Sequence, residues 1–129
     1  MDVSGSRVIV SNSKFEKVSD KAISAGENSE LILKSSKVVD ALVGVAAKDG
    51  SKVVADNNEF RDSGLRDFMA YTKKPEYPYP RIDISSRDKR VLSILSSLGS
   101  TVYYNGDPIA SEEIDVDQLY NTVMKSSRK

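Results

Sequence analysis

The chain contains no cysteine and no histidine among its 129 residues. Without cysteine there is no disulfide, no zinc–thiolate centre and no thiol nucleophile. Without histidine the chain lacks the commonest general base, the commonest metal ligand and the central member of a Ser-His-Asp triad. Any chemistry must therefore depend on carboxylates, lysine, arginine, tyrosine or serine.

The sequence also lacks an excess of either charge and any long apolar run. Its 19 basic residues balance 19 acidic ones, so no net field attracts nucleic acid or an anionic membrane surface. No apolar segment approaches the roughly 18 residues that a membrane span needs. We therefore expect neither nucleic acid binding nor membrane insertion.

No signal peptide follows Met1, but the chain begins within a repeat, which predicts that it is part of a longer protein.

What the chain does contain is a repeat. Three stretches align at a spacing of about 22 to 23 residues, and a bulky apolar residue follows each of them. Each stretch opens with serine, alternates through aliphatic side chains and closes on small polar residues. A fixed period in this range is typical of stacked units that bury a core only against their neighbours. The stretches are 6–12, 29–35 and 51–57, and the bulky residues that follow are Phe15, Val38 and Phe60.

Apolar residues alternate within each unit, which predicts strands with one buried face. Three short strands per turn predict a mainly β chain folded as a right-handed parallel β-helix of about 3–4 coils. Leucine-rich repeats would need a regular leucine grid, and helical repeats a spacing of about 3.6 residues. The predicted interior residues are Val8, Val10, Phe15, Ile23, Leu31, Leu33, Val38, Val45, Val53 and Phe60, with Met69 and Tyr71 continuing the column of Ile23 and Val45.

Small polar residues and glycines recur where the coil must turn. Stacked asparagine or serine side chains at one corner can bond to one another and to turn backbone. Glycines near the other corner are expected to take a positive φ. Turn formation is the simplest interpretation of both sets. They are Asn12, Ser35 and Asn57 at the first corner, and Gly5, Gly26 and Gly50 at the second.

The repeat is interrupted after residue 72. Residues 73–80 contain three prolines, which cannot donate ladder hydrogen bonds, so this segment is predicted to project from the stack as a loop. Alternation resumes at 81–84. We therefore assign the β-helix to residues 1–84 and a small α+β cap to residues 85–129. The cap is predicted to contain a helix over 91–98 that ends at Gly99, a strand and turn over 101–106, and a final helix, capped by Asp115, with Leu119, Tyr120 and Val123 on one side.

Several words of the sequence, above all Lys-Asp-Gly-Ser at 48–51 and Tyr-x-Lys-Lys-Pro at 71–75, carry a family resemblance. Residues 1–84 resemble the right-handed parallel β-helix segments at the C-terminal ends of larger bacterial surface proteins, some with a spore-coat-kinase-like domain upstream. The resemblance implies an extracellular or cell-surface location and no assigned activity. More distantly, the fold is similar to that of pectate lyases and other polysaccharide-active β-helices, a likeness that does not carry function.

Stacking the units should gather charged side chains at one corner. Glu27, Asp49 and Lys73 fall in successive coils, about 4.8 Å apart. Two stacked carboxylates predict a calcium site at Glu27 and Asp49, because hard cations want several oxygen ligands. The alternative is a solvated ladder of charges, worth about 0.2–1 kcal/mol per pair.

The proline-rich loop is the other candidate. It combines tyrosine rings with cations, a mixture suited to stacking on a sugar ring and pairing with its carboxylate; alternatively, Tyr71, Tyr77 and Tyr79 pack back over the last coil. In polysaccharide lyases of this fold, calcium screens a uronate carboxylate while lysine or arginine removes the α-proton. That likeness makes Lys73 and Arg81 candidate bases. The predicted ligand-binding residues are Glu27, Asp49, Lys73, Lys74, Tyr77 and Arg81.

Two classes of function remain open. The first is a non-catalytic β-helix module with a structural or interaction role on a surface or extracellular protein, with weak carbohydrate or calcium binding. The second is a polysaccharide lyase or glycoside hydrolase. The first coil also leaves Val8 and Val10 without a neighbour on one side, which predicts either a homodimer through this end or an upstream domain that covers it.

Overall fold

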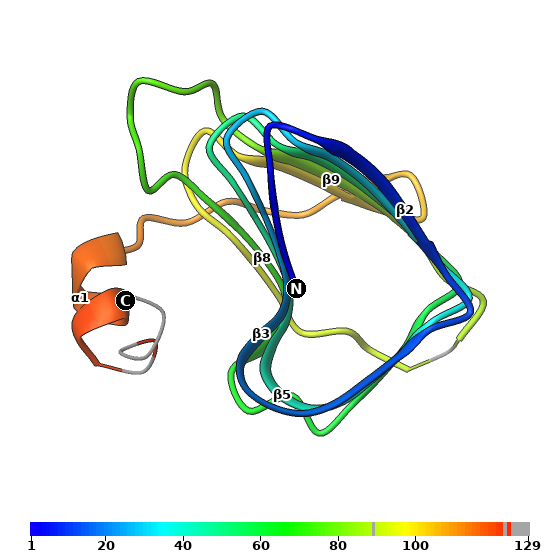
Figure 1. The fold of residues 1–129 in the computed structure, drawn as a ribbon. Helices are drawn as coiled ribbons and strands as arrows, with labels where there is room; N and C mark the ends of the chain where they lie inside the picture. The colour runs from blue at the N-terminus through cyan, green and yellow to red at the C-terminus, as the bar shows by residue number, and fades with distance from the viewer. Residues whose placement is uncertain (89, 123, 125–129) are drawn as a thin grey trace.

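The computed structural model describes residues 1–88, 90–122 and 124, which form a right-handed β-solenoid of about four turns with one short helix (Figure 1). Two six-stranded sheets make up its walls. Sheet A comprises β1 (Asp2–Ser4), β3 (Lys14–Gly26), β5 (Lys37–Lys48), β7 (Glu59–Arg61), β8 (Arg66–Tyr71) and β10 (Ile94–Ser96). Sheet B comprises β2 (Arg7–Ser11), β4 (Glu30–Lys34), β6 (Lys52–Asp56), β9 (Arg81–Ser85), β11 (Thr101–Tyr104) and β12 (Asp107–Pro108), and the helix is α1 (Val116–Asn121).

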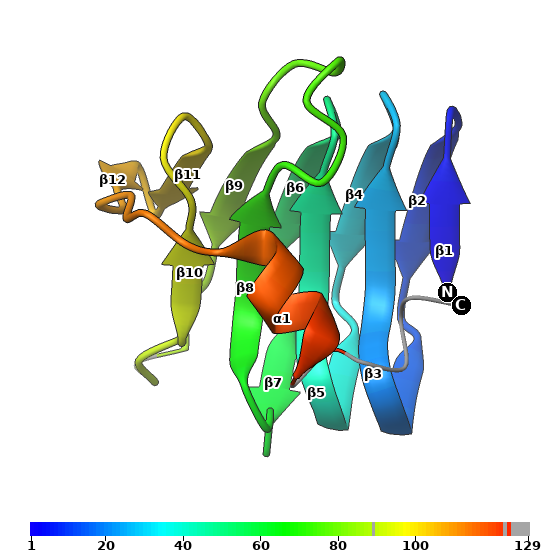
Figure 2. The same cartoon turned by 90° about the vertical axis from the view of Figure 1, so that its left-hand side faces the viewer.

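The strands of successive coils pair in parallel and in register, so that equivalent residues stack along the solenoid axis (Figure 2). Leu31, Val38 and Val45 are fully buried in the interior. Val8, Val10 and Phe15 are half-buried and pack on the same core, because the first coil has a neighbour on one side. The predicted interior columns are confirmed for Val8, Leu31 and Val53 in sheet B and for Phe15, Val38 and Phe60 in sheet A. Ile82 and Val102 extend the sheet B column, which the sequence did not predict.

The second column of sheet A differs from the prediction in its third coil. Val45 pairs with Phe68, so Phe68 enters the core while Met69 and Tyr71 point to the outer face of the sheet. The expectation that Met69 and Tyr71 continue the interior column was wrong. The chain uses one residue more between Phe60 and Phe68 than between Val38 and Val45, and an added residue sends every following side chain to the opposite face.

The helix expected over 91–98 is also wrong. Residues Ile94–Ser96 form β10, which pairs in parallel with β8 and places Leu95 beside Met69. The exposed edge of β8 offers backbone hydrogen bonds to this segment, and such tertiary pairing overrides a helical spacing of leucines. Val91 and Leu98, two of the residues that suggested the helix, are 92% and 55% exposed. The parallel ladder therefore continues beyond residue 84 into β10 and β11.

The rest of the C-terminal segment agrees with the sequence. Strand β11 is followed by a tight turn at Asn105 and Gly106, both with positive φ. The carboxylate of Asp115 accepts a hydrogen bond from the Gln118 backbone N–H at 3.0 Å and caps α1. Tyr120 is buried, whereas Val123 lies outside the described residues. No helix in the described part of the chain is long and apolar enough to cross a membrane.

The two corners turn through left-handed backbone. Asn12, Ser35 and Asn57 have φ of 51°, 51° and 50°, as their repeated position predicts. At the other corner Gly5 and Gly50 have positive φ, but Gly26 lies inside β3 with no positive φ. The expectation for Gly26 was wrong; Glu27 and Asp49 occupy the left-handed positions there, at 43° and 51°.

The two ends of the solenoid differ. At the C-terminal end of sheet B, β12 folds back antiparallel on β11. At the other end, β1 and β2 are the last strands of their sheets in the described structure, and Ile9 is 60% exposed there. Unpaired strand edges of this kind favour pairing with another chain. A homodimer through this end stays a prediction, which light scattering tests.

Candidate functional site

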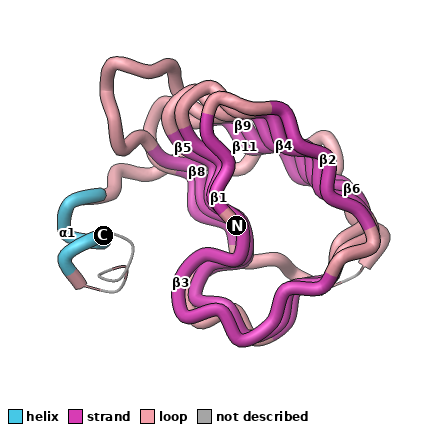
Figure 3. The backbone as a smooth tube through the Cα atoms, in the orientation of Figure 1, coloured by secondary structure: helices cyan, strands magenta, loops and turns pink. Residues whose placement is uncertain are grey.

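The proline-rich loop leaves the solenoid between β8 and β9 and projects from the corner of the coil (Figures 1 and 3). Asp49 anchors it. One carboxylate oxygen, Oδ1, accepts hydrogen bonds from the backbone N–H groups of Lys73 and Lys74, at 2.8 and 2.7 Å. Asp49 is 1% exposed. Its carboxylate therefore holds the loop against the third coil.

Glu27 lies one coil away from Asp49 and forms an ion pair with the ammonium group of Lys74. The hydrogen bond from Lys74 lowers the pKa of Glu27, and the same bond raises the pKa of Lys74. Both side chains remain more than one third exposed, so solvent screens the pair and its contribution to stability is small. The carboxylates of Asp49 and Glu27 thus attach the proline-rich loop to the solenoid.

Lys73 turns away from this corner toward the C-terminal helix. Its Nζ lies 4.4 Å from the centre of the Tyr120 ring, a cation–π contact. The Tyr77 backbone N–H donates to the Lys74 carbonyl oxygen at 3.2 Å within the loop. Tyr71 is fully buried beneath α1, so its ring is not available to stack on a sugar.

Arg81 belongs to a different surface. On β9 of sheet B its guanidinium pairs with the Asp83 carboxylate at 2.7 Å and lies 5.0 Å from the centre of the Tyr103 ring. The hydrogen bond to Asp83 raises the pKa of Arg81. The structure therefore brings together Glu27, Asp49, Lys74 and the backbone of Lys73, with Tyr77 on the same loop, while the Lys73 side chain lies against Tyr120. It does not bring Arg81 to them.

Next to this corner, the outer face of sheet A forms a polar pocket of about 400 Å³. The helix α1 covers the neighbouring part of the face, as Figure 2 shows. We call this cavity the lysine pocket, because three lysines from separate coils or loops line it. Its lining residues are Asp2, Val3, Ser4, Asp20, Lys21, Ser24, Gly26, Glu27, Lys48 and Lys73.

Lys48, the last residue of β5, is one of the three lysines that line the lysine pocket. Within the described part of the chain its ammonium group has neither an ion pair nor a hydrogen bond. Burial lowers its pKa, and the positive charges of Lys21 and Lys73 lower it further. Its stem lies over Gly26: a Cβ atom on that glycine would stand 3.3 Å from Lys48 Cε. Glycine at this position gives the side chain its room.

Lys21 lies deeper in the pocket, with 5% of its side chain exposed. Its Nζ is 3.4 Å from both carboxylate oxygens of Asp20 and 5.2 Å from the centre of the Tyr120 ring. Burial lowers its pKa in spite of the nearby carboxylate. Lys21 is thus a buried, paired cation, whereas Lys48 has no ion-pair partner among the described residues, and the more distant carboxylates of Asp49 and Asp2 offset its charge in part.

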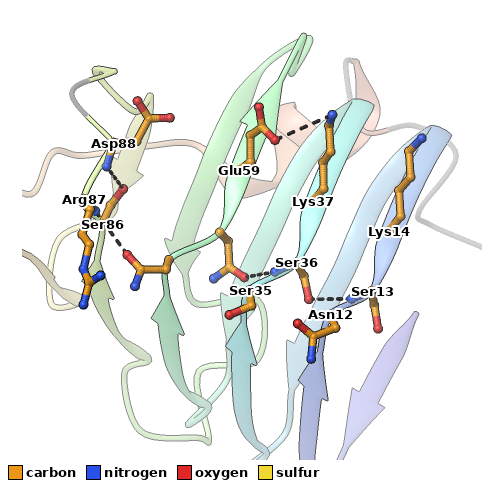
Figure 4. Close-up of a pocket in the computed structure, with 12 residues that line it drawn as sticks. Asn12, Ser13, Lys14, Ser35, Ser36, Lys37, Glu59, Ser86, Arg87 and Asp88 are labelled. Carbon is orange, nitrogen blue, oxygen red and sulfur yellow. Dashed lines mark hydrogen bonds and ion pairs between the residues drawn. The ribbon is translucent and has the colours of Figure 1, made fainter.

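A second, larger hollow of about 600 Å³ follows the asparagine and serine corner (Figure 4). Its hydrogen bonds run from coil to coil: the Ser13 N–H donates to Ser36 Oγ at 3.1 Å, and the Ser36 N–H donates to Asn58 Oδ1 at 2.9 Å. The predicted ladder is therefore displaced by one residue from Asn12 and Ser35. These polar groups already have partners within the protein, which identifies this corner as a turn-stabilising ladder.

The structure places no further acidic side chain beside Glu27 and Asp49 to complete the predicted calcium site among the described residues. Among the described residues, no three acidic, histidine or cysteine side chains gather in an arrangement that could hold a metal ion. Asp49 uses one oxygen on two backbone N–H groups, and Glu27 uses one on Lys74. Calcium binding stays a prediction, and a thermal shift measured with calcium tests it, because binding to the folded state raises the melting temperature.

Searches with family models, against curated proteins and against solved structures find no match to this chain. The site must therefore be judged on its own geometry. Sequence reasoning named Lys73 as a ligand-binding residue but assigned no such role to Lys21 or Lys48, and it considered Gly26 as a turn residue alone. The signal was present: Lys48 follows Ala46 by two residues in a strand, so both point to the outer face.

Proposed function

We propose that this chain is a non-catalytic β-helix module that binds an acidic carbohydrate in the lysine pocket, as part of a surface or extracellular protein. The observation that carries the proposal is the ammonium group of Lys48, which has no ion-pair partner among the described residues and lines a cavity together with Lys21 and Lys73. A cation that is partly desolvated and lacks a partner is costly. An incoming carboxylate would remove that cost.

The carboxylates around the pocket support this assignment. Asp20 pairs with Lys21, Glu27 pairs with Lys74, and Asp49 faces the loop backbone. Each of these acidic groups is thus committed to a partner other than Lys48. Ser4, Ser24 and Asp2 line the same cavity and offer hydrogen-bonding atoms of the kind that sugar hydroxyl groups require. The surface location rests on the resemblance of residues 1–84 to β-helix segments of surface proteins.

The test is titration calorimetry with uronate oligosaccharides, using neutral oligosaccharides of the same length as the comparison. We expect binding of the uronates that weakens with salt, since the contact is electrostatic. Lys48→Gln should reduce the affinity about tenfold, equivalent to about 1.4 kcal/mol. Lys34→Gln, at the exposed last residue of β4, is the matched control and should leave the affinity unchanged. Equal binding of neutral and acidic sugars would contradict the proposal.

A lyase or hydrolase activity is the second candidate, and one observation favours it: the lowered pKa values of Lys21 and Lys48 bring an amine closer to the range of a general base. Lys73 lines the same pocket, but Arg81 lies on sheet B with a raised pKa. Absorbance of unsaturated products from uronate polymers, with and without calcium, measures such turnover. Turnover that disappears in Lys73→Ala would replace the binding proposal with a lyase.

A further inference from the structure

Lys48 has the surroundings of a reactive amine as well as those of an anion-binding cation. It is reached from a cavity, it lacks an ion-pair partner in the described structure, and two further ammonium groups line the same cavity. Lysines that are desolvated or placed beside another cation act as nucleophiles toward carbonyl carbons. The neighbouring cations would hold the carboxylate of a compound that carries both groups.

We propose that Lys48 forms an imine with 2-oxo acids, compounds in which a carbonyl group adjoins a carboxylate, while the positive charges of Lys73 and of the buried Lys21 attract that carboxylate. The proposal rests on the proposed function in one respect: the same pocket receives the carboxylate. It requires no carbohydrate and no turnover.

The chemical step is balanced without a further reactant. The neutral amine of Lys48 attacks the carbonyl carbon, and a bond forms between Nζ and that carbon. The carbon–oxygen bond then breaks, and the oxygen leaves as water together with the two hydrogens of the amine. The product is an imine, and no oxidant or reductant takes part.

Burial and the neighbouring charges explain why the pKa of Lys48 differs from that of an exposed lysine. Burial is the largest influence on its pKa, followed by the two lysines, and all three lower it; nearby carboxylates act in the opposite direction with smaller effect. More of Lys48 is therefore in the neutral, nucleophilic form at a given pH than of an exposed lysine. The charged groups around it are Lys21 on β3, Lys73 on the proline-rich loop, Asp2 on β1, and Glu27 and Asp49 at the corner.

Of the two lysines with a lowered pKa in this pocket, Lys48 is the better candidate for the nucleophile. Lys21 is held at 3.4 Å by Asp20, and 5% of its side chain is exposed. That carboxylate stabilises the protonated form of Lys21, and its burial restricts the approach of a carbonyl carbon. Lys48 carries no such partner among the described residues, so its amine is the better candidate for attack on the carbonyl carbon.

The experiment incubates the full chain with pyruvate and sodium cyanoborohydride near neutral pH, so that any imine is reduced to a stable secondary amine. Peptide mapping by mass spectrometry then compares labelling at Lys48 with labelling at Lys34, an exposed lysine on β4. We expect Lys48 to be labelled about tenfold more than Lys34, equivalent to about 1.4 kcal/mol. Equal labelling of the two lysines would overturn the proposal.

Two comparisons isolate the parts of the mechanism. Methyl pyruvate has the same carbonyl group without the negative charge, so the preference for Lys48 over Lys34 should fall toward one. A preference that is unchanged with the ester would disprove recognition of the carboxylate. Lys48→Arg keeps the charge but removes the amine and should abolish the selective label, with circular dichroism confirming the fold; selective labelling that persists elsewhere in the pocket would assign the reaction to a different residue.

The outcome is distinguishable from that of the carbohydrate test. Uronate oligosaccharides whose reducing end has been converted to an alcohol contain no carbonyl group, so they report on anion binding alone. Labelling by pyruvate with no binding of these sugars would support the reactive amine and contradict the carbohydrate proposal. Binding of these sugars without selective labelling would do the reverse.

Discussion

The interior of the solenoid and the outer face of sheet A are built from the same strands but by different rules. Inside, equivalent residues of successive coils stack as apolar columns, such as Leu31 on Val53. Outside, the face is divided: α1 covers an apolar part around Met69 and Tyr71, and the lysine pocket occupies a polar part. The interior residues repeat because every coil needs apolar side chains of similar size in its core. The pattern of the outer face depends instead on α1, which covers part of that face.

The largest expected effect is in the interior. Phe60 lies 4.7 Å from Phe68, centre to centre, and a Cβ atom on Gly44 would stand 2.7 Å from its ring, so the packing is tight. Phe60→Ala should lower the free energy of unfolding by about 3–5 kcal/mol. Ile9→Ala, at a side chain that is 60% exposed on the outside of β2, should change it by less than about 0.5 kcal/mol. Urea denaturation measures both.

Similar losses in these two variants would contradict the division between interior and exterior. A loss of cooperativity in Phe60→Ala, seen as transitions that differ between fluorescence and circular dichroism, would show that the coils unfold separately. Neighbour-by-neighbour stacking permits such behaviour in long repeat arrays. In about four turns we expect one transition.

The interior could be predicted from the sequence because its pattern is local and repeated. The spacing of Val8, Leu31 and Val53 is enough to predict that these residues form one interior column. The phase of Met69 was predicted wrongly although the first coil contains the signal: Phe68 follows Phe60 at the same distance as Ile23 follows Phe15. A shift by one residue places Met69 on the opposite face. Residues 91–98 have a helical spacing, and the edge of β8, which no local pattern reveals, draws part of them into a strand.

The candidate site was predictable to a smaller extent. The corner of Glu27, Asp49, Lys73 and Lys74 follows from the repeat, and the structure brings these residues together. The lysine pocket does not follow from it, because α1 and the loop decide which part of the outer face stays open. Arg81 was grouped with the loop by sequence proximity, although it is the first residue of β9 and its side chain pairs with Asp83 on sheet B.

The next effect concerns the attachment of the loop. Asp49→Ala removes the acceptor of two backbone hydrogen bonds, from Lys73 and Lys74. Hydrogen bonds to a charged group contribute about 1.5–3 kcal/mol, so we expect a loss of stability in that range. Asp56→Ala, at an exposed position of β6, is the control and should have little effect. Proteolysis within 73–80 should also become faster in Asp49→Ala, and an unchanged rate would contradict the anchoring role.

A smaller effect is expected beneath α1. The hydroxyl groups of Tyr71 and Tyr120 are 2.7 Å apart and buried, and burial raises the pKa of Tyr71 well above its usual value. Tyr120→Phe leaves the Tyr71 hydroxyl without this partner and should cost about 1–2 kcal/mol. Adding Tyr71→Phe removes both groups and should restore part of the loss. The pairing would be contradicted if the double variant lost more free energy of unfolding than the two single variants lose in total.

The smallest effect on stability, and the sharpest test of the polar half of the outer face, is expected at Gly26. Its φ is not positive, so alanine fits the backbone, but the new Cβ would stand 3.3 Å from Lys48 Cε and displace that side chain toward solvent. We expect Gly26→Ala to change the free energy of unfolding by less than about 1 kcal/mol. The pKa of Lys48 should rise toward its ordinary value, because burial is the main cause of its lowering. Labelling of Lys48 by pyruvate and cyanoborohydride should then fall toward that of Lys34, whereas Gly64→Ala, at a glycine outside the pocket lining, should leave it unchanged. Undiminished labelling in Gly26→Ala would mean that the position of Lys48 over this glycine does not control its reactivity.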